Sequence, residues 1–345
     1  MIGSSGLLGR LPIGVVENAV MQTDSEPPLD LETKFRMVQD AGVFDYLEID
    51  PPSNRLAEYQ ALSAKYAVPI RACGYSYQVG RDEALLERHL RVAALLGSRV
   101  LNVQMLRHHA RGHVASNEEI ADAYAHVADV GASIGCLPCV EVHVDMWSED
   151  FKRVEQVADL VEAGGRPFRL TLDPSHVVFK IDNAEEQMIL GLRRELEERS
   201  LVIDPNEPGN VMSRWIGRNL VWHAHARSAA PNNPKNIKAY HPDGRVGRGI
   251  QYPFVEPREG QYHAPWHATA LEAWKTAMRM LLRHHAADEA SPLGQLSVEF
   301  IPFPDYGSGG GYSIFENSVA CSLWLRGEIA VSLTEASKTA RAEVQ

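Results

Sequence analysis

Short apolar segments alternate with amphipathic segments along the chain. Eight apolar segments have the length and composition of buried strands, at residues 12–16, 44–49, 69–75, 99–105, 137–144, 168–172, 219–226 and 295–301. Apolar residues recur at helical spacing between and after them, at 31–40, 55–66, 82–96, 117–134, 150–162, 184–200, 271–284 and 318–329. Eight strands that alternate with helices predict an α/β fold, the (β/α)8 or TIM barrel.

The length of the chain fits one such barrel. A barrel of about 250 residues with added loops accounts for 345 residues, so we predict a single domain over 1–345. The connections after strands six and seven, 177–218 and 228–267, exceed the usual loop of about 2 to 6 residues and are interpreted as long insertions. The first contains a charged helical pattern typical of a solvated surface, on which a partner subunit could dock. The second is interpreted as a lid, with a packing or oligomer-contact loop as the alternative.

Composition and charge exclude several classes of function. Apolar residues make up 45% of the chain, and the formal charge of −11 is unfavourable for binding a nucleic-acid backbone. No segment has the roughly 18 apolar residues of a membrane span, and residues 1–10 lack a signal-peptide pattern. We predict a cytoplasmic enzyme that forms a homo-oligomer and binds neither nucleic acid nor membrane. The four cysteines, with the pair Cys136 and Cys139, are interpreted as buried thiols.

In the last four predicted strands, the acids and histidines stand at alternate positions and therefore share one face of each strand. Alternate side chains of a barrel strand point toward the axis, and the inward set holds acids and histidines late in each strand: Glu141, His143 and Asp145; Asp173; His223, His225 and Arg227; Glu299. Buried acids without a partner cost several kcal/mol, so a cation is expected among them. Oxygen and imidazole ligands favour Mn²⁺, with Mg²⁺, Co²⁺ or Zn²⁺ as alternatives. His223 alone fits a core histidine, and Arg227 could pair with an inward acid.

Four motifs in order carry a resemblance to a known family. They are Val140-Glu141-Val142-His143, Asp173-Pro174-Ser175-His176, His225-Ala226-Arg227 and Val298-Glu299-Phe300, with a Gly247-Arg248-Gly249 turn. With the motifs in this order, the chain resembles the xylose-isomerase-like barrel superfamily. The resemblance is clear in the second half of the chain and rests only on the alternation of strands and helices in the first half. The resemblance implies that Glu141, Asp173, His225 and Glu299 bind the metal, and that His176 and Arg227 hold substrate oxygens. Ser228 departs from the Asp that many members carry.

The metal implies chemistry beside a carbonyl. A chelated cation polarises a substrate carbonyl and stabilises an enediolate, while Glu141 and Glu299 move the proton. We therefore expect a carbohydrate isomerase or epimerase acting on an unphosphorylated sugar, since no glycine-rich phosphate loop is evident. The alternative is a lyase, either a dehydratase or a C-glycoside deglycosylase of a 3-keto-glycoside, with His143 as the base. Aromatic residues in 252–266 and 302–307 suggest a pocket larger than a bare sugar needs.

Several further residues are left with two interpretations. His108 and His109 end the fourth strand and are predicted to contact substrate, with a solvated basic loop as the alternative. Glu17 and Glu48 come late on the first two strands and could reach the pocket or serve the fold. A phosphodiesterase resembling endonuclease IV is less favoured, because the second strand ends in Leu47-Glu48-Ile49-Asp50 without a histidine.

Overall fold

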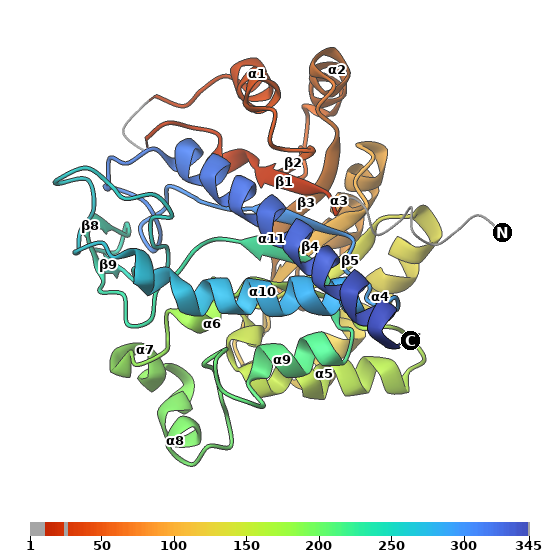
Figure 1. Ribbon diagram of the computed structural model, residues 1–345. Coiled ribbons are helices and arrows are strands. Elements are labelled where there is room, and N and C mark those ends of the chain that lie inside the picture. The colour runs from red at the N-terminus through yellow and green to blue at the C-terminus, as the bar shows by residue number, and fades with distance from the viewer. Residues whose placement is uncertain (1–10, 24–26, 344–345) are drawn as a thin grey trace.

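The computed structural model describes residues 11–23 and 27–343. In this part of the chain, eight parallel strands close into a barrel in the order β1-β10-β7-β6-β5-β4-β3-β2 (Figure 1). Their bounds are β1 Ile13–Val16, β2 Tyr46–Ile49, β3 Ile70–Tyr77, β4 Val100–Met105, β5 Leu137–Glu141, β6 Leu170–Leu172, β7 Val221–Ala226 and β10 Gln295–Val298. The predicted barrel is confirmed. Its strands end earlier than expected at β5 and β10, so His143 and Glu299 lie beyond the sheet.

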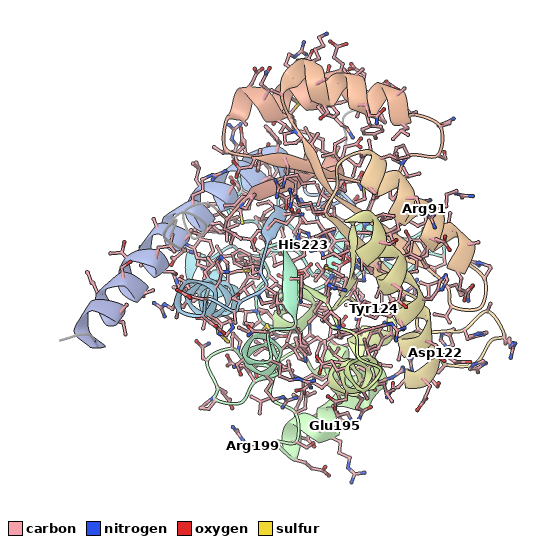
Figure 2. All side chains as sticks on the ribbon, turned by 90° about the vertical axis from the view of Figure 1, so that its right-hand side faces the viewer. Arg91, Asp122, Tyr124, Glu195, Arg199 and His223 are labelled. Atoms are coloured by element: carbon pink, nitrogen blue, oxygen red, sulfur yellow. The ribbon has the colours of Figure 1, made fainter. Side chains whose placement is uncertain are left out.

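Helices form the outer layer around the barrel. They are α1 Leu31–Ala41, α2 Leu56–Tyr66, α3 Glu83–Leu95, α4 Asn117–Ile134, α5 Phe151–Ala163, α9 Val211–Gly217, α10 Glu272–Ala287 and α11 Ile314–Glu343. Local sequence sets their ends: Ser116 and Glu119 form a capping box at the start of α4, and Gly135 ends it at a φ of 75°. Figure 2 shows His223 among the barrel strands, while Asp122 of α4 lies at the outer rim.

The connection between β6 and β7 differs from the prediction. The pattern at 184–200 forms two short helices, α7 Ala184–Met188 and α8 Leu192–Glu197, because Leu190 adopts a φ of 61° and breaks the helix. A short helix, α6 Ser175–Val178, begins within the Asp173-Pro174-Ser175-His176 motif. Helix α9 then packs beside α10 and serves as the barrel helix before β7. The material added to the barrel is therefore smaller than 177–218.

The connection after β7 contains an antiparallel pair that the sequence did not predict, β8 Asn236–Tyr240 and β9 Val246–Gly247. This hairpin packs on the segment that follows β10. Asn236 Nδ2 donates to the carbonyl oxygens of Pro304 at 3.0 Å and Ser308 at 2.8 Å. At Gly247 a Cβ atom would lie 1.8 Å from the Pro304 oxygen, so only glycine permits this approach. Such packing favours the packing-loop interpretation over a lid.

Two further expectations can be compared with the structure. All four cysteines are buried and free, as predicted. Among the described residues, no helix is both long and apolar enough to cross a membrane. The absence of a signal-peptide pattern concerned residues 1–10, which lie outside the described residues.

Candidate metal centre

Four ligand-type side chains meet where the barrel strands end. Glu141 is the last residue of β5 and His225 lies on β7, while Asp173 and Glu299 come directly after β6 and β10. One ligand atom from each lies within 4.8 Å of the others. All four are buried, and the most exposed, Glu299, is 8% exposed. The structure thus brings together the four residues that the sequence singled out as metal ligands.

The charges in this cluster do not balance. His225 Nδ1 lies 3.1 Å from Glu141 Oε1 and 2.9 Å from Glu299 Oε2. Arg227 Nη2 lies 2.9 Å from Glu299 Oε2 and also contacts Asp173. Burial opposes a charge on His225, but the surrounding carboxylates raise its pKa well above the usual value. Buried carboxylates in excess, together with one imidazole nitrogen, are a donor set that fits a divalent cation.

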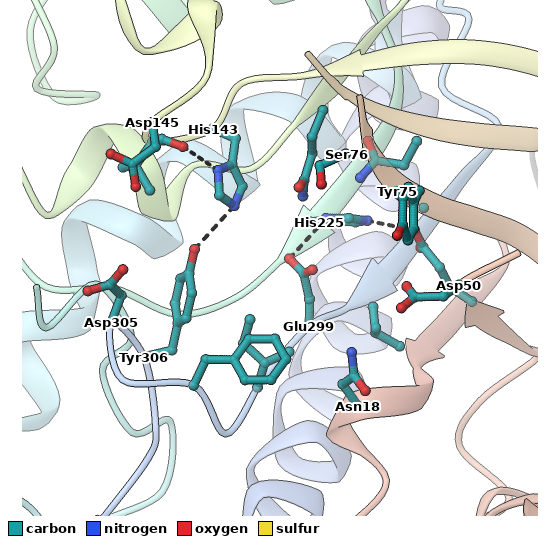
Figure 3. Close-up of a pocket in the computed structure, with 18 of the residues that line it drawn as sticks. Asn18, Asp50, Tyr75, Ser76, His143, Asp145, His225, Glu299, Asp305 and Tyr306 are labelled. Carbon is teal, nitrogen blue, oxygen red and sulfur yellow. Dashed lines mark hydrogen bonds and ion pairs between the residues drawn. The ribbon is translucent and has the colours of Figure 1, made fainter. Parts of the chain in front are cut away.

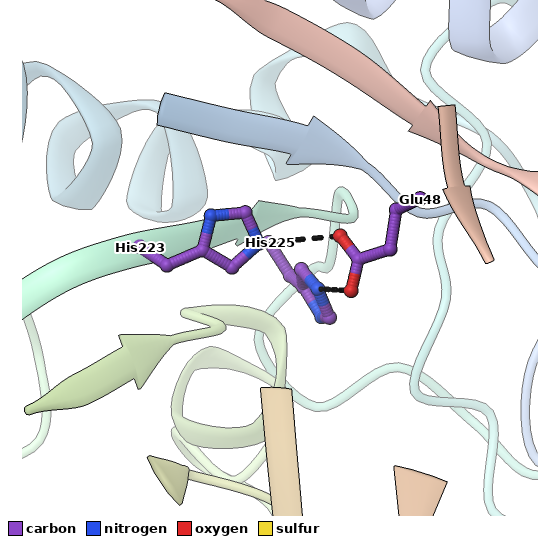
Figure 4. Close-up of side chains that lie close together, drawn as sticks. All are labelled: Glu48, His223 and His225. Carbon is purple, nitrogen blue, oxygen red and sulfur yellow. Dashed lines mark hydrogen bonds and ion pairs between the residues drawn. The ribbon is translucent and has the colours of Figure 1, made fainter. Parts of the chain in front are cut away.

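Glu48 on β2 holds the other side of His225. Its two carboxylate oxygens lie 3.0 Å from His225 Nε2 and 3.2 Å from His223 Nε2 (Figure 4). Burial raises the pKa of Glu48, but the two histidines outweigh it and hold that pKa below its usual range. A metal-binding histidine commonly has a carboxylate on its second nitrogen. Hence Nδ1 of His225 is the nitrogen available to a metal, and Glu48 sets its orientation.

Glu141 is fixed by two amides that sequence reasoning missed. Asn102 Nδ2 and Gln104 Nε2 donate to Glu141 Oε2 at 2.6 and 2.7 Å. Burial raises the pKa of Glu141, but His225 and Asn102 outweigh it and lower that pKa to about 2. The available signal was parity, because these amides alternate with apolar residues in the fourth strand.

His143 lies in the turn after β5. Its Nδ1 is 2.6 Å from the carbonyl oxygen of Val144, and its Nε2 is 3.1 Å from the Tyr306 hydroxyl. Two residues later the chain turns at Asp145, which has a φ of 64°, so the strand no longer sets its direction; its side chain is exposed and lines the cavity. His143 therefore owes its place to the turn and to Tyr306, whereas the strand itself ends at Glu141.

His176 and Arg227 form one buried pair. Arg227 Nη2 donates to His176 Nε2 at 3.0 Å, and both side chains are fully buried. Burial lowers the pKa of His176 well below its usual value, so the ring is neutral. The alternative reading of Arg227, an ion pair with an inward acid, describes its contacts here. A role for the pair in binding substrate stays a prediction.

A cavity of about 490 Å³ opens above the cluster (Figure 3). Its volume lies in the range of small-molecule sites. Of the four ligand-type residues, His225 and Glu299 line it, and its wall is rich in acids. Burial and the nearby Glu17 and Glu48 raise the pKa of Asp50, on this wall, to about 6. The remaining polar and aromatic lining includes Asn18, Tyr75, Ser76, Asn102, Gln104, His143, Asp145, His241, Phe303, Asp305 and Tyr306.

Comparison with known proteins bears on the fold. No family model and no curated protein matches the sequence. Among solved structures, D-allulose 3-epimerase from Methylomonas sp. with D-allulose is 14% identical, with 92% of this chain and 97% of that chain covered and a TM-score of 0.53. A xylose isomerase-like TIM barrel protein from Mycobacterium smegmatis with magnesium is 13% identical, with 95% and 99% covered and a TM-score of 0.55. The chain has the xylose-isomerase-like barrel fold.

Other proteins with the xylose-isomerase-like fold agree with this picture. An L-ribulose 3-epimerase is 13% identical, with 97% of this chain and 99% of that chain covered and a TM-score of 0.52. The IOLI protein, solved with a bound zinc atom, is 13% identical, with 94% and 99% covered and a TM-score of 0.51. At these identities the likeness shows the fold alone. Solved members of this fold thus include proteins with zinc or magnesium bound.

The structure places His108 and His109 away from the cavity. His108 is exposed, and His109 packs on Gly80, where a Cβ atom would lie 2.2 Å from the imidazole. His109 Nδ1 accepts from the backbone N–H of Arg111 at 3.0 Å, and its ring stacks on His113 at 4.7 Å. Neither histidine is among the described residues that line the cavity. His108 agrees with the alternative interpretation, a solvated basic loop, whereas His109 is buried.

Proposed function

We propose that this protein is a divalent-metal-dependent isomerase or epimerase of a carbohydrate, with Mn²⁺ as the preferred ion. The observation that carries the proposal is the set of four buried ligand atoms within 4.8 Å of one another below an acidic cavity. Glu141, Asp173, Glu299 and Nδ1 of His225 would hold the ion. The fold it shares with sugar epimerases supports a carbohydrate substrate. The acidic wall disfavours a phosphorylated sugar, because like charges repel.

A bound divalent cation would withdraw charge from a substrate carbonyl and make the neighbouring C–H acidic. The residues of the chain would then move the proton. Glu299 lines the cavity and reaches toward it from the end of β10, whereas Glu141 is fully buried with one oxygen tied to two amides. We therefore assign the proton transfer first to Glu299, with Glu141 as its partner on the opposite side of the axis.

The pair formed by Arg227 and His176 would hold substrate oxygens. Arg227 Nη1 is buried and has no hydrogen-bond partner among the described residues. A guanidinium donor left unpaired in a buried site is costly, and a substrate oxygen would satisfy it. Nδ1 of His176 is buried and unpaired within the same described part of the chain, so the pair offers two donors.

A lyase is the second candidate, and one observation favours it. His143 lines the cavity, and its imidazole is an acid–base group of a different kind from the carboxylates there. An imidazole at this position can remove a proton beside a carbonyl, after which a leaving group departs from the adjacent carbon. In a dehydratase the leaving group would be water, whereas a 3-keto-glycoside would release its aglycone by cleavage of the C-glycosidic bond.

Deuterium exchange tests the proposal. Purified protein loaded with Mn²⁺ would be incubated in D₂O with D-allulose, D-fructose and D-tagatose, and deuterium at the carbon beside the carbonyl would be measured by NMR. We expect exchange in the wild type and in the control Glu197→Gln, which changes an exposed residue of α8. We expect none in Glu299→Gln. A 3-keto-glycoside that releases aglycone, without ketose exchange, would replace the isomerase with the lyase.

A further inference from the structure

Tyr306 is a lining residue of the cavity to which the proposed chemistry gives no role. It lies in the segment after β10, is 6% exposed and lines the cavity. Its hydroxyl lies 3.1 Å from His143 Nε2, and Figure 3 shows the two side chains pointing toward each other. The pair joins two segments that are far apart in the sequence.

The hydrogen bonds of His143 define where its proton sits. The carbonyl oxygen of Val144 can only accept, so the Nδ1 atom that lies 2.6 Å away must carry the proton. Nε2 is then the acceptor in the neutral ring, and the hydroxyl of Tyr306 donates to it. The result is an imidazole in one tautomer, with its basic nitrogen at the cavity wall.

The ring of Tyr306 packs against two buried side chains. The guanidinium carbon of Arg227 lies 4.2 Å from the centroid of the Tyr306 ring, and the centroid of the His176 ring lies 6.2 Å away at an interplanar angle of 83°. Burial outweighs the attraction of Arg227 and raises the pKa of Tyr306 well above its usual value. Tyr306 thus stays protonated and is a donor to His143.

The β8–β9 hairpin holds the backbone on both sides of Tyr306. The Asp305 carboxylate accepts from the backbone N–H of Arg248 and pairs with His241 Nε2, both at 2.8 Å. The backbone N–H of Ile250 donates to the Asp305 carbonyl oxygen at 2.8 Å. Asn236 binds the carbonyl oxygens of residues 304 and 308 on either side. Every one of these contacts comes from the connection after β7.

We propose that Tyr306 is a positioning residue for His143, and that the β8–β9 hairpin serves to place it. Tyr306 keeps the imidazole in the tautomer with its proton on Nδ1 and, through the hydrogen bond from its hydroxyl to Nε2, fixes the orientation of the ring at the cavity wall. The effect on turnover rests on the second candidate of the proposed function, the lyase, in which His143 is the base. The effect on the tautomer does not depend on that function.

The ring nitrogens of His143 provide the first test. Protein with ¹⁵N-labelled histidine would be studied by NMR at about pH 8, where a free imidazole is neutral, with His143→Gln used to assign the signals. In the wild type we expect a protonated Nδ1 and an unprotonated Nε2. In Tyr306→Phe we expect the Nε2 signal to move or the tautomers to mix, while the control Tyr66→Phe, on the outer helix α2, stays unchanged. Unchanged His143 shifts in Tyr306→Phe would overturn the proposal.

A second variant tests the hairpin. Asn236→Ala removes the side chain that binds the segment on both sides of Tyr306. We expect the His143 signals to move in the same direction as in Tyr306→Phe, by a smaller amount. His143 signals identical to those of the wild type would overturn the role of the hairpin.

Kinetics provide the third test once a substrate is found. Tyr306→Phe should lower kcat on the order of a hundredfold, the low end of what a positioned acid–base group contributes, with little change in KM. In the His143→Gln background the same change should have no further effect, because Tyr306 acts through His143. If the losses in kcat of the two single variants multiplied in the double variant, Tyr306 would not act through His143. If no sugar turns over, the proposed function fails, while the NMR result still decides the role of Tyr306.

Discussion

Glu48 binds His225 without belonging to the proposed set of metal ligands, so Glu48→Gln tests the geometry around His225. Glutamine keeps the size of the side chain but offers one acceptor oxygen where the carboxylate offered two. In the structure those two oxygens serve His225 Nε2 at 3.0 Å and His223 Nε2 at 3.2 Å. One of the two rings must then face an amide NH₂, so His225 loses either its orientation or its basicity.

The expected magnitude follows from similar supporting carboxylates. Their loss weakens metal binding about 10- to 100-fold, which corresponds to about 1.4 to 2.7 kcal/mol. Isothermal titration with Mn²⁺ would measure the affinity, and far-UV circular dichroism would confirm the fold. Glu58→Gln, an exposed residue of α2 that pairs with Arg55, is the matched control and should bind like the wild type.

Two results would refute this reasoning. If Glu48→Gln binds Mn²⁺ within twofold of the wild type while His225→Ala loses binding, then Glu48 does not support the ligand. If His225→Ala itself binds normally, the metal is held elsewhere, and the four-residue centre is wrong.

Three further predictions concern charge. Asp50→Asn should raise the melting temperature above pH 6 and leave it unchanged at pH 4, because the raised pKa of Asp50 means that its carboxylate destabilises the fold progressively as pH rises from about 4 to 6. Lys180→Met should cost about 3 kcal/mol in urea unfolding, since it leaves the buried Glu149 and Glu186 short of a cation. Glu299→Gln should abolish deuterium exchange and weaken Mn²⁺ binding by titration, whereas Glu197→Gln changes neither.

The prediction of the candidate site rested mainly on strand parity, the alternation of inward and outward side chains along a strand. Polar residues at alternate positions mark the axis side of a barrel strand, so the sequence alone grouped Glu141, Asp173, His225 and Glu299. The structure brings these residues together. The same reasoning stopped working where a strand ends, as at Asp145, because the turn is set by contacts with other loops.

The features that could not be predicted from the sequence depend on tertiary contacts. Glu48 could be placed near the pocket from its strand, but its pairing with His223 and His225 requires β2 and β7 to face each other across the barrel. The β8–β9 hairpin lies in a polar segment without strand periodicity, and it forms against the chain after β10. The helix expected at 184–200 is broken where Leu190 and Gly191 both adopt the left-handed conformation. Gly191 was the available signal for this break, whereas left-handed leucine is unfavourable and was not expected.

The close approach of Gly247 to Pro304 separates two properties of the protein. Any side chain at 247 would push the hairpin away from the segment that carries Tyr306, whereas three of the four proposed metal ligands, Glu141, Asp173 and His225, lie on or next to β5, β6 and β7, outside this contact. If the proposed function holds, we expect substitutions in the hairpin to change turnover more than metal affinity. A library randomised over 236–249 and sorted for retained Mn²⁺ binding would be a source of new activities on one conserved scaffold.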